Sequence, residues 1–276
     1  MYSIAQSFHD AAEANGRQIL VRARFNGTTT LTGDNIIDVS VTEAVGTSGG
    51  ITMGATPASK LTMKIKAPDS PLALSGGTVA PSVAFMTDEE TPYCPLGKFF
   101  ITEAKSNDDF ATTYTVTGYD AFCKTETPYK PKIAMPNTAQ AILADIAAQC
   151  GFPISQDIVY PSGSFDLYDY SCRQYIGYFA GLTGRNARFD RNGELTFIWY
   201  TDKGYTVDRE HQYLGGFRRT TDADFSVNSI TSGSSDATVT AGNGIGISFE
   251  NPFMTQDVLD GIFAAVGTFS FTPAQL

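Results

Sequence analysis

Residues 97–129 constrain the fold of this 276-residue chain more than any other stretch. Residues 98–104 and 112–119 alternate apolar and polar side chains with the period of half-buried strands. The polar residues 106–109 between them are typical of a turn. Alternate residues of the first strand are expected on opposite faces: Phe99, Ile101 and Glu103 on one, Phe100, Thr102 and Ala104 on the other. The stretch therefore predicts an antiparallel hairpin, which the chain leaves at Gly118-Tyr119-Asp120.

The same period extends over residues 18–122 and predicts several short strands. Ile19, Val21, Ala23 and Phe25 alternate with their neighbours, and Ile37, Val39 and Val41 continue the same period. In the clearest strand, Leu61, Met63 and Ile65 are expected to face inward. In the last strand, Lys60, Lys64 and Lys66 point outward and either protect a sheet edge or face an acidic partner. Connections are expected at Asn26-Gly27 and at Pro57, Pro68, Pro71 and Pro81. Together these features predict an antiparallel barrel or sandwich.

Residues 123–205 change character and predict a compact module of helices followed by a hairpin. One helix is expected to start at Asn137, with Gln140 completing a capping box, and to end at Gly151. The next is expected to start at a capping box of Ser171 and Gln174 and to end at residue 184. Its expected hydrophobic staple is Tyr170 with Tyr175, its inward face carries Ile176, Phe179 and Ala180, and a hairpin follows around Asn192-Gly193.

The two ends of the chain are expected to add further elements. Residues 3–15 predict a short helix with a capping box at Ser3 and Gln6 and a stop at Asn15-Gly16. So short a helix must dock, either on its own barrel or on a neighbouring subunit. Residues 225–230, 237–240 and 244–249 predict strands, and residues 255–267 predict a helix. Another strand is expected to begin in residues 271–276, so this β region is expected to be incomplete.

Composition excludes several classes of function. The net charge of -10 and the sequence pI of about 4.6 disfavour binding to nucleic acid, and no run of Lys or Arg offsets them. The charged fraction of 17% is below the usual value of about 25%, which suggests that partners cover part of the surface. We expect no membrane anchor, because no signal-peptide pattern and no apolar run of about 20 residues is present, and we expect a soluble chain made in the cytoplasm.

No catalytic, cofactor-binding or metal site is predicted, and the chain is expected not to be an enzyme. Cys94, Cys123, Cys150 and Cys172 form no C-x-x-C pair and are expected to be free thiols. His9 and His211 lie in no catalytic motif. The acidic groups at 88–90, 108–109 and 222–224 are expected to be solvated turns, and the glycine-rich segment 242–246 a flexible turn rather than a phosphate loop.

The order of these motifs resembles a known family. The stretch 97–129, the helix 137–151, the run SCRQYIGYFA at 171–180, Gly184-Arg185-Asn186-Ala187 and the turn at 190–195 carry the resemblance. They are similar to the N-terminal part of tail-tip hub proteins of long-tailed phages and prophages, a family related to the baseplate hub of contractile phages. The resemblance covers most of the chain.

The resemblance implies an α+β, mainly β fold with two antiparallel β-barrel-like domains and an inserted helix-plus-hairpin module. The divisions would be an N-terminal helix at 1–17, a first barrel at 18–122, the module at 123–205 and a second barrel at 206–276. The second barrel is expected to be incomplete in this chain. A homotrimer would form a pseudo-sixfold ring in the virion, assembled in the bacterial cytoplasm. Its implied partners are the tail tube and distal tail proteins on one side and a tape-measure, spike or host-binding component on the other, and DNA would pass through without specific binding.

Two alternatives remain open at this point. One is a tail-associated cell-wall hydrolase or peptidase whose catalytic domain lies outside this sequence. The other is a carbohydrate-binding β module, suggested by the aromatic residues between Tyr160 and Tyr178. Within that segment Tyr168 and Tyr170 are the candidate sugar-binding side chains, whereas Tyr175 and Phe179 are expected in the core.

Overall fold

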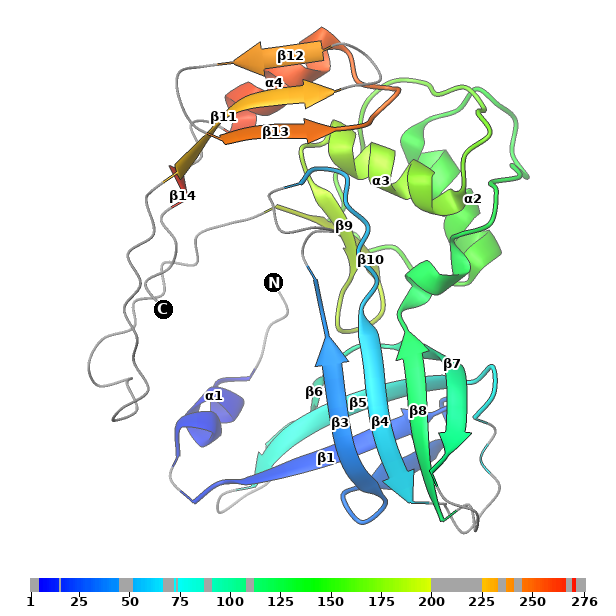
Figure 1. Ribbon diagram of the computed structural model, residues 1–276, viewed down its shortest axis with the longest axis vertical. Helices are drawn as coiled ribbons and strands as arrows, with labels where there is room; N and C mark the ends of the chain where they lie inside the picture. The colour runs from blue at the N-terminus through cyan, green and yellow to red at the C-terminus, as the bar shows by residue number, and fades with distance from the viewer. Residues whose placement is uncertain are drawn as a thin grey trace.

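The computed structural model describes residues 5–14, 16–44, 52–66, 72, 74–86, 91–107, 112–199, 225–232, 237–240, 245–266 and 270–271. Figure 1 shows an N-terminal sheet at one end and a smaller C-terminal sheet with a helix at the other. Helices α2 (Ala139–Cys150) and α3 (Cys172–Leu182) lie between these sheets, beside the hairpin of β9 (Asn186–Phe189) and β10 (Leu195–Ile198). The mainly β character with some helices is therefore confirmed.

The N-terminal sheet is antiparallel throughout, in the order β2-β1-β5-β7-β8-β4-β3, with β6 paired to β5. Its strands are β1 (Gln18–Phe25), β2 (Thr29–Thr32), β3 (Ile36–Thr42), β4 (Lys60–Lys66), β5 (Thr78–Met86), β6 (Cys94–Pro95), β7 (Phe99–Ser106) and β8 (Thr113–Tyr119). The predicted hairpin is confirmed as β7 and β8. This order is an open path, so the described strands form no closed barrel.

Strand β4 shows the predicted alternation but not the predicted position. Leu61, Met63 and Ile65 are fully buried, and Lys60 and Lys64 are exposed on the opposite face. However, β4 is hydrogen-bonded to β8 on one side and to β3 on the other. The prediction that its lysines protect an edge is therefore wrong, because this strand lies inside the sheet.

Two register shifts move side chains to the face opposite the one predicted. In β7 the pairing shifts between Ile101 and Glu103, and Ala104 packs against the core in place of Glu103. A similar shift in β3 lets Ile36 pack on the core and leaves Ile37 48% exposed. An extra residue in one strand reverses the alternation beyond it, and a simple period of two does not reveal this.

One further prediction in this sheet is wrong. Pro81 lies within β5 rather than in a connection. On that side of β5, residues 78–79 pair with β7 and residues 82–83 pair with β6, so the proline occupies the gap between two partners. There its missing N–H breaks no continuous ladder. Ile19 is 63% exposed, because the first part of β1 extends beyond the core.

Helix α1 (Gln6–Glu13) docks on its own sheet, as one of the two alternatives predicted. The ring centroids of Phe8 and Phe85 of β5 are 4.8 Å apart. The predicted capping box is wrong, because the helix begins at Gln6 with Ala5 at the cap position. The expected cap residue, Ser3, lies outside the described residues.

The start of α2 lies one residue beyond the prediction. Thr138 is the N-cap, and its hydroxyl oxygen accepts a hydrogen bond from the backbone N–H of Ala141 at 3.3 Å. Asn137 is instead paired through its backbone with Phe165, in a short antiparallel bridge. The helix ends as predicted at Gly151, whose φ of 75° is the left-handed conformation that glycine favours.

The α2–α3 module has a single hydrophobic core that reaches into both neighbouring parts of the chain. Its fully buried residues include Ile142, Leu143, Tyr175, Ile176 and Phe179. Met53, from the segment before β4, and Leu259 and Ile262 of the C-terminal helix belong to the same cluster. The module is therefore the packing centre that connects the two sheets.

The C-terminal unit consists of β11 (Phe225–Ser232), β12 (Ala237–Thr240), β13 (Ile245–Phe249), α4 (Gln256–Val266) and β14 (Ser270–Phe271). The strand and helix positions agree with the prediction. The pairing does not, because β13 runs parallel to β11, whereas β12 and β14 run antiparallel to it. Among the described residues, no helix has both the length and the apolar character that crossing a bilayer requires.

Candidate functional site

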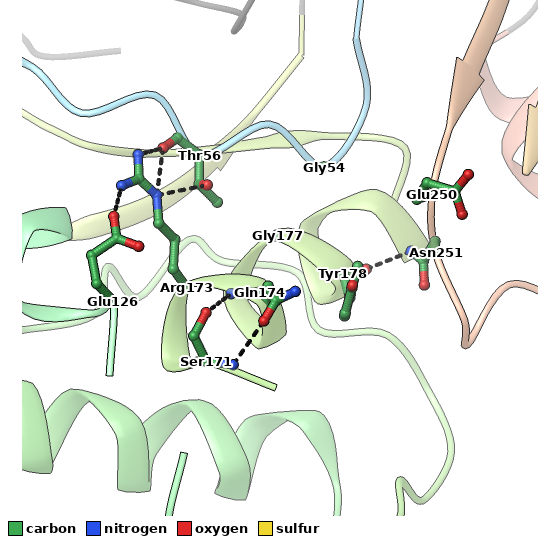
Figure 2. Close-up of a pocket in the computed structure, with 10 residues that line it drawn as sticks. All are labelled: Gly54, Thr56, Glu126, Ser171, Arg173, Gln174, Gly177, Tyr178, Glu250 and Asn251. Atoms are coloured by element: carbon green, nitrogen blue, oxygen red, sulfur yellow. Dashed lines mark hydrogen bonds and ion pairs between the residues drawn. The ribbon is translucent and has the colours of Figure 1, made fainter. Parts of the chain in front are cut away.

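An open pocket of about 470 Å³ lies against the first turns of α3, where three parts of the chain meet (Figure 2). One wall comes from Gly54 and Thr56, in the segment that precedes β4. The floor is the exposed side of α3, and the far wall is Glu250 and Asn251, which follow β13. The site therefore gathers residues from the N-terminal sheet, the module and the C-terminal unit.

The first turn of α3 is fixed by the predicted capping box. The hydroxyl of Ser171 accepts from the backbone N–H of Gln174 at 3.2 Å, and the Gln174 side-chain oxygen accepts from the N–H of Ser171 at 2.9 Å. The predicted staple is also present, with the rings of Tyr170 and Tyr175 edge to face at 5.8 Å. These contacts hold the helix start rigidly and so set the direction of Arg173.

Arg173 ties the helix to the segment before β4. Its Nε donates to the carbonyl and hydroxyl oxygens of Thr56 at 3.2 and 3.1 Å, and its terminal nitrogens bond the same carbonyl and form an ion pair with Glu126. The guanidinium also lies 5.2 Å from the ring centre of Phe122. The positive charge is thus used within the fold, and the pocket is a joint rather than an anion site.

Glycines allow two backbones to cross directly above this joint. A Cβ added to Gly177 of α3 would lie 2.7 Å from the carbonyl oxygen of Gly54. Gly54 has a φ of +73°, and a Cβ there would lie 2.8 Å from the carbonyl oxygen of Gly177. Beyond the crossing, the backbone N–H of Gly54 donates to the carbonyl oxygen of Arg185 at 2.9 Å. The backbone N–H of Ala55 donates to the side-chain oxygen of Asn186, also at 2.9 Å. The segment is thereby fixed along β9.

Asn251 attaches the C-terminal unit to the same helix. The side chain is 1% exposed, and its amide donates to the carbonyl oxygen of Tyr178 at 2.9 Å. Its side-chain oxygen accepts from the N–H of Phe253 at 3.1 Å. One helix therefore carries the anchoring contacts of both flanking regions.

A buried carboxylate marks the other end of the module, where the chain leaves β8. Asp120 is 3% exposed, and its oxygens accept from the N–H groups of Ser59 at 2.7 Å and Phe122 at 3.0 Å. Burial raises the pKa of Asp120 to about 6, although both hydrogen bonds and Arg173 act in the opposite direction. The side chain starts the 3-10 helix η1 (Ala121–Lys124), which leads into the module.

The hairpin of the module reaches back to the N-terminal sheet. Its turn is closed by Asp190, whose carboxylate accepts from the N–H groups of Asn192 and Glu194 at 2.9 and 2.8 Å. A Cβ added to Gly193 would lie 2.9 Å from the side chain of Lys98, just before β7. The turn predicted at Asn192-Gly193 is therefore also a contact between module and sheet.

The aromatic candidates divide between surface and core. Tyr168 is 46% exposed and stacks on Tyr170, with ring centroids 5.7 Å apart and planes at 24°. Tyr170 packs edge to face on Phe253 at 6.3 Å. Tyr175 and Phe179 are fully buried, as predicted. Tyr168 also contacts Phe253, with ring centroids 5.4 Å apart, so the stacked pair is held against the module core while Tyr168 stays partly exposed.

The thiols are free, as predicted, and Cys94, Cys150 and Cys172 are buried. A hydrogen bond between Cys150 and Cys172 raises the pKa of the Cys150 thiol and lowers that of Cys172.

The remaining site candidates from the sequence are not brought together. His9 is exposed on α1, whereas His211, the acidic groups 88–90, 108–109 and 222–224, and residues 242–244 lie outside the described part of the chain. In that part, no three His, Cys, Asp or Glu residues are arranged to hold a metal.

Sequence reasoning missed three residues of the joint, Gly54, Arg173 and Asn251. The sequence does contain a signal that a backbone segment, here the one with Gly54, can approach this helix closely. Gly177 and Gly181 are four residues apart in a predicted helix and therefore lie on one face. Small residues at that spacing permit the close approach of another backbone. The partner segment cannot be identified from the same pattern, since it lies far away in the sequence.

Comparison with known proteins gives a fold but no family. No family model and no curated protein matches the sequence. The crystal structure of the tail protein from Neisseria meningitidis MC58 is similar over 88% of this chain and 74% of that one, with a TM-score of 0.51 and 12% identity. The chain shares the fold of this tail protein.

Two further solved structures with lower scores are also tail proteins. The prophage MuSo2 43 kDa tail protein from Shewanella oneidensis is 14% identical, with a TM-score of 0.47 over 86% of this chain and 75% of that one. The prophage tail protein gp18 from Listeria monocytogenes EGD-e is 11% identical, with a TM-score of 0.45 over 88% and 77%. The structural neighbours named here are thus tail proteins of bacteria and their prophages.

Proposed function

We propose that this chain is a structural protein of a phage or prophage tail. The observation that carries the proposal is the fold shared with the tail protein from Neisseria meningitidis across 88% of the chain. The match extends over most of the chain, so it is not confined to a common sheet motif. The order of motifs in the sequence supports the same role independently of the fold.

The joint on α3 suits a load-bearing component. Gly54 and Thr56 tie the N-terminal sheet to α3, and Asn251 ties the C-terminal unit to it. A tail component must transmit force between the proteins on its two sides without bending at its internal junctions. Polar groups that are paired inside the joint contribute to this rigidity.

Within the tail, we assign the chain to the hub at the distal tip. Three copies, each with two β regions, would form a ring of six units that matches a hexameric tail tube. The tube and distal tail proteins would contact one face, and a tape-measure, spike or host-binding component the other. The charged fraction of only 17% supports extensive coverage of the surface by such neighbours. We propose no enzymatic activity for the chain.

Molar mass in solution tests the hub assignment. Light scattering coupled to size exclusion, over a wide range of concentration, is expected to give three times the chain mass of 29.6 kDa. Negative-stain images of the same fraction should show a ring with threefold symmetry. A monomer at every concentration, for this chain and for any longer form of it, would rule out the trimeric hub.

Sugar binding is a second candidate function because Tyr168 is 46% exposed and stacks on Tyr170. Faces of aromatic rings are common platforms for sugar rings. Glycan-array binding that is lost in Tyr168→Ala and retained in Tyr168→Phe would support it. An array with no signal above that of Tyr168→Ala would reject it, without affecting the tail assignment.

A further inference from the structure

A second groove, distant from the α3 joint, lies on the outer face of the N-terminal sheet. It has a volume of about 580 Å³, and its lining includes Arg22, Arg24, Thr30, Pro81, Ser82 and Tyr93. Strands β2, β1 and β5 form its floor, and the chain entering β6 forms one wall. The inner face of β1, with Ala23 and Phe25, is buried, so the two arginines point away from the core.

Arg22 is held in a fixed orientation within this groove. Its Nε donates to the hydroxyl of Ser82 at 3.2 Å, and its guanidinium carbon lies 3.7 Å from the centre of the Tyr93 ring. Ser82 is directly opposite Arg22 in the β1–β5 ladder. The stack and the hydrogen bond use one face and one N–H of the guanidinium. Its terminal nitrogens make no hydrogen bond or ion pair to a described residue, which leaves them available to a ligand.

Arg24 lies two residues further along the same face of β1. Its neighbours across the ladders are Thr30 and Ala80, whose side chains are short. Arg24 makes neither a hydrogen bond nor an ion pair with any residue that the structure describes. Residues two apart in a strand are separated by about 6.5–7 Å. The groove therefore presents two guanidinium groups that no described carboxylate neutralises, at the repeat distance of an extended chain.

We propose that this groove binds an extended acidic peptide segment of a partner protein, with carboxylates at alternate positions as in Glu-x-Glu. Alternate side chains of an extended peptide point to the same side and repeat at the same distance as the two arginines. A guanidinium matches a carboxylate with paired hydrogen bonds. Tyr93 and Pro81 add apolar surface beside the two arginines. Adjacent carboxylates would point in opposite directions and reach only one arginine.

An acidic peptide fits better than a nucleic acid. The chain carries a net charge of -10, so a long polyanion is repelled by most of its surface. A short peptide contacts only the groove, where positive charge is concentrated. The proposal does not depend on the tail function, because it concerns the chemistry of one groove in the isolated chain.

Fluorescence anisotropy with labelled synthetic peptides tests the proposal. The probes are a ten-residue peptide with glutamates at alternate positions, an isomer with the same glutamates in adjacent pairs, and a glutamine version. A ten-nucleotide oligothymidylate tests for general anion binding. The full chain is expected to bind the alternating peptide several-fold more tightly than its isomer, and to bind the other two weakly, since these lack the matched carboxylates.

A matched pair of charge-removing variants and two variants of Tyr93 test whether the peptide binds in this groove. Arg24→Gln removes a side chain without a described partner and should fold normally, yet it is expected to weaken binding about tenfold, equivalent to about 1.4 kcal/mol. Lys64→Gln makes the same charge change on an exposed residue of β4 and is expected to leave affinity unchanged. Tyr93→Phe should bind like wild type, and Tyr93→Ala more weakly because Arg22 loses its stack.

Several results would overturn the proposal. They are no binding of the alternating peptide, equal binding of its isomer or of the oligonucleotide, and equal losses for Arg24→Gln and Lys64→Gln. The last two outcomes would indicate general electrostatic attraction rather than a groove with defined spacing. Thermal unfolding of each variant establishes that it is folded under the conditions of the binding measurement.

Discussion

Ser59 and Asp120 are joined by backbone and side-chain hydrogen bonds in opposite directions. The N–H of Ser59 donates to the Asp120 carboxylate at 2.7 Å, and the N–H of Asp120 donates to the Ser59 carbonyl oxygen at 3.1 Å. Ser59 immediately precedes β4, and Asp120 immediately follows β8. The pair therefore fixes the point at which two adjacent strands leave the sheet and meet the module.

The pH dependence of stability should report on this carboxylate. Because burial raises the pKa of Asp120 from 3.8 to about 6, the folded state holds this proton more tightly than the unfolded state. The stabilisation is complete below pH 3.8 and is lost as the pH rises through about 6. The loss is about 2–3 kcal/mol, since one pKa unit corresponds to about 1.4 kcal/mol.

Chemical denaturation at several pH values, with Asp120→Asn as the variant, measures this loss. Asparagine does not titrate and offers one acceptor oxygen instead of two, so the variant is expected to be less stable by about 1–3 kcal/mol at low pH. The gap should narrow as the pH rises, because only the wild type loses stability from this group. Asp169→Asn makes the same change at an exposed position and serves as the matched control. If the stability of Asp120→Asn and that of the wild type changed equally with pH, this would contradict a pKa of about 6 for Asp120.

The glycine crossing predicts opposite effects for the same substitution in two helices. Gly177→Ala places a Cβ 2.7 Å from the Gly54 carbonyl oxygen and should destabilise the fold by about 1–3 kcal/mol, despite the better helix propensity of alanine. Gly261→Ala in α4 meets nothing within 4 Å and should stabilise that helix by up to about 1 kcal/mol. Thermal unfolding of both variants checks the contrast. Equal stability of Gly177→Ala and wild type would mean that the two backbones do not cross so closely.

The contacts of Arg173 predict that Arg173 and Glu126, although they form one ion pair, contribute unequally to the free energy of unfolding. Arg173→Ala removes the hydrogen bonds to Thr56 that fix the segment before β4, and should cost about 2 kcal/mol. Glu126→Gln should cost less than about 0.5 kcal/mol, because the Glu126 side chain is 62% exposed. Urea denaturation of the two variants measures both values. Equal losses would indicate that the ion pair, rather than the contact with Thr56, holds the arginine.

Local signals in the sequence predicted local structure well. The capping box at Ser171 and Gln174, the staple of Tyr170 and Tyr175 and the stop at Gly151 all depend on residues within one or two helical turns, and all are present. The N-cap of α2 is predicted one residue too early, because Asn137 and Thr138 are both residues that can cap a helix. The backbone pairing of Asn137 with Phe165 leaves Thr138 as the cap.

Features that depend on long-range pairing could not be predicted from the sequence. Bulges in β3 and β7 move Ile37 and Glu103 away from the core, and the partner strand determines where a bulge forms. The parallel pairing of β13 with β11 is likewise a property of topology rather than of either strand alone. The joint on α3 combines segments far apart in the chain, so only its helix was predicted.

Immunogold labelling of phage particles tests the central claim, a structural role at the tail tip, most directly. Particles would be induced from a bacterium that carries this gene and labelled with an antibody raised against the part of the module at residues 123–199. A strain with the gene deleted provides the control. The account predicts gold at the distal end of the tail, and none in the deletion strain. Gold along the tube or at the head, or intact particles that carry no gold, would contradict it.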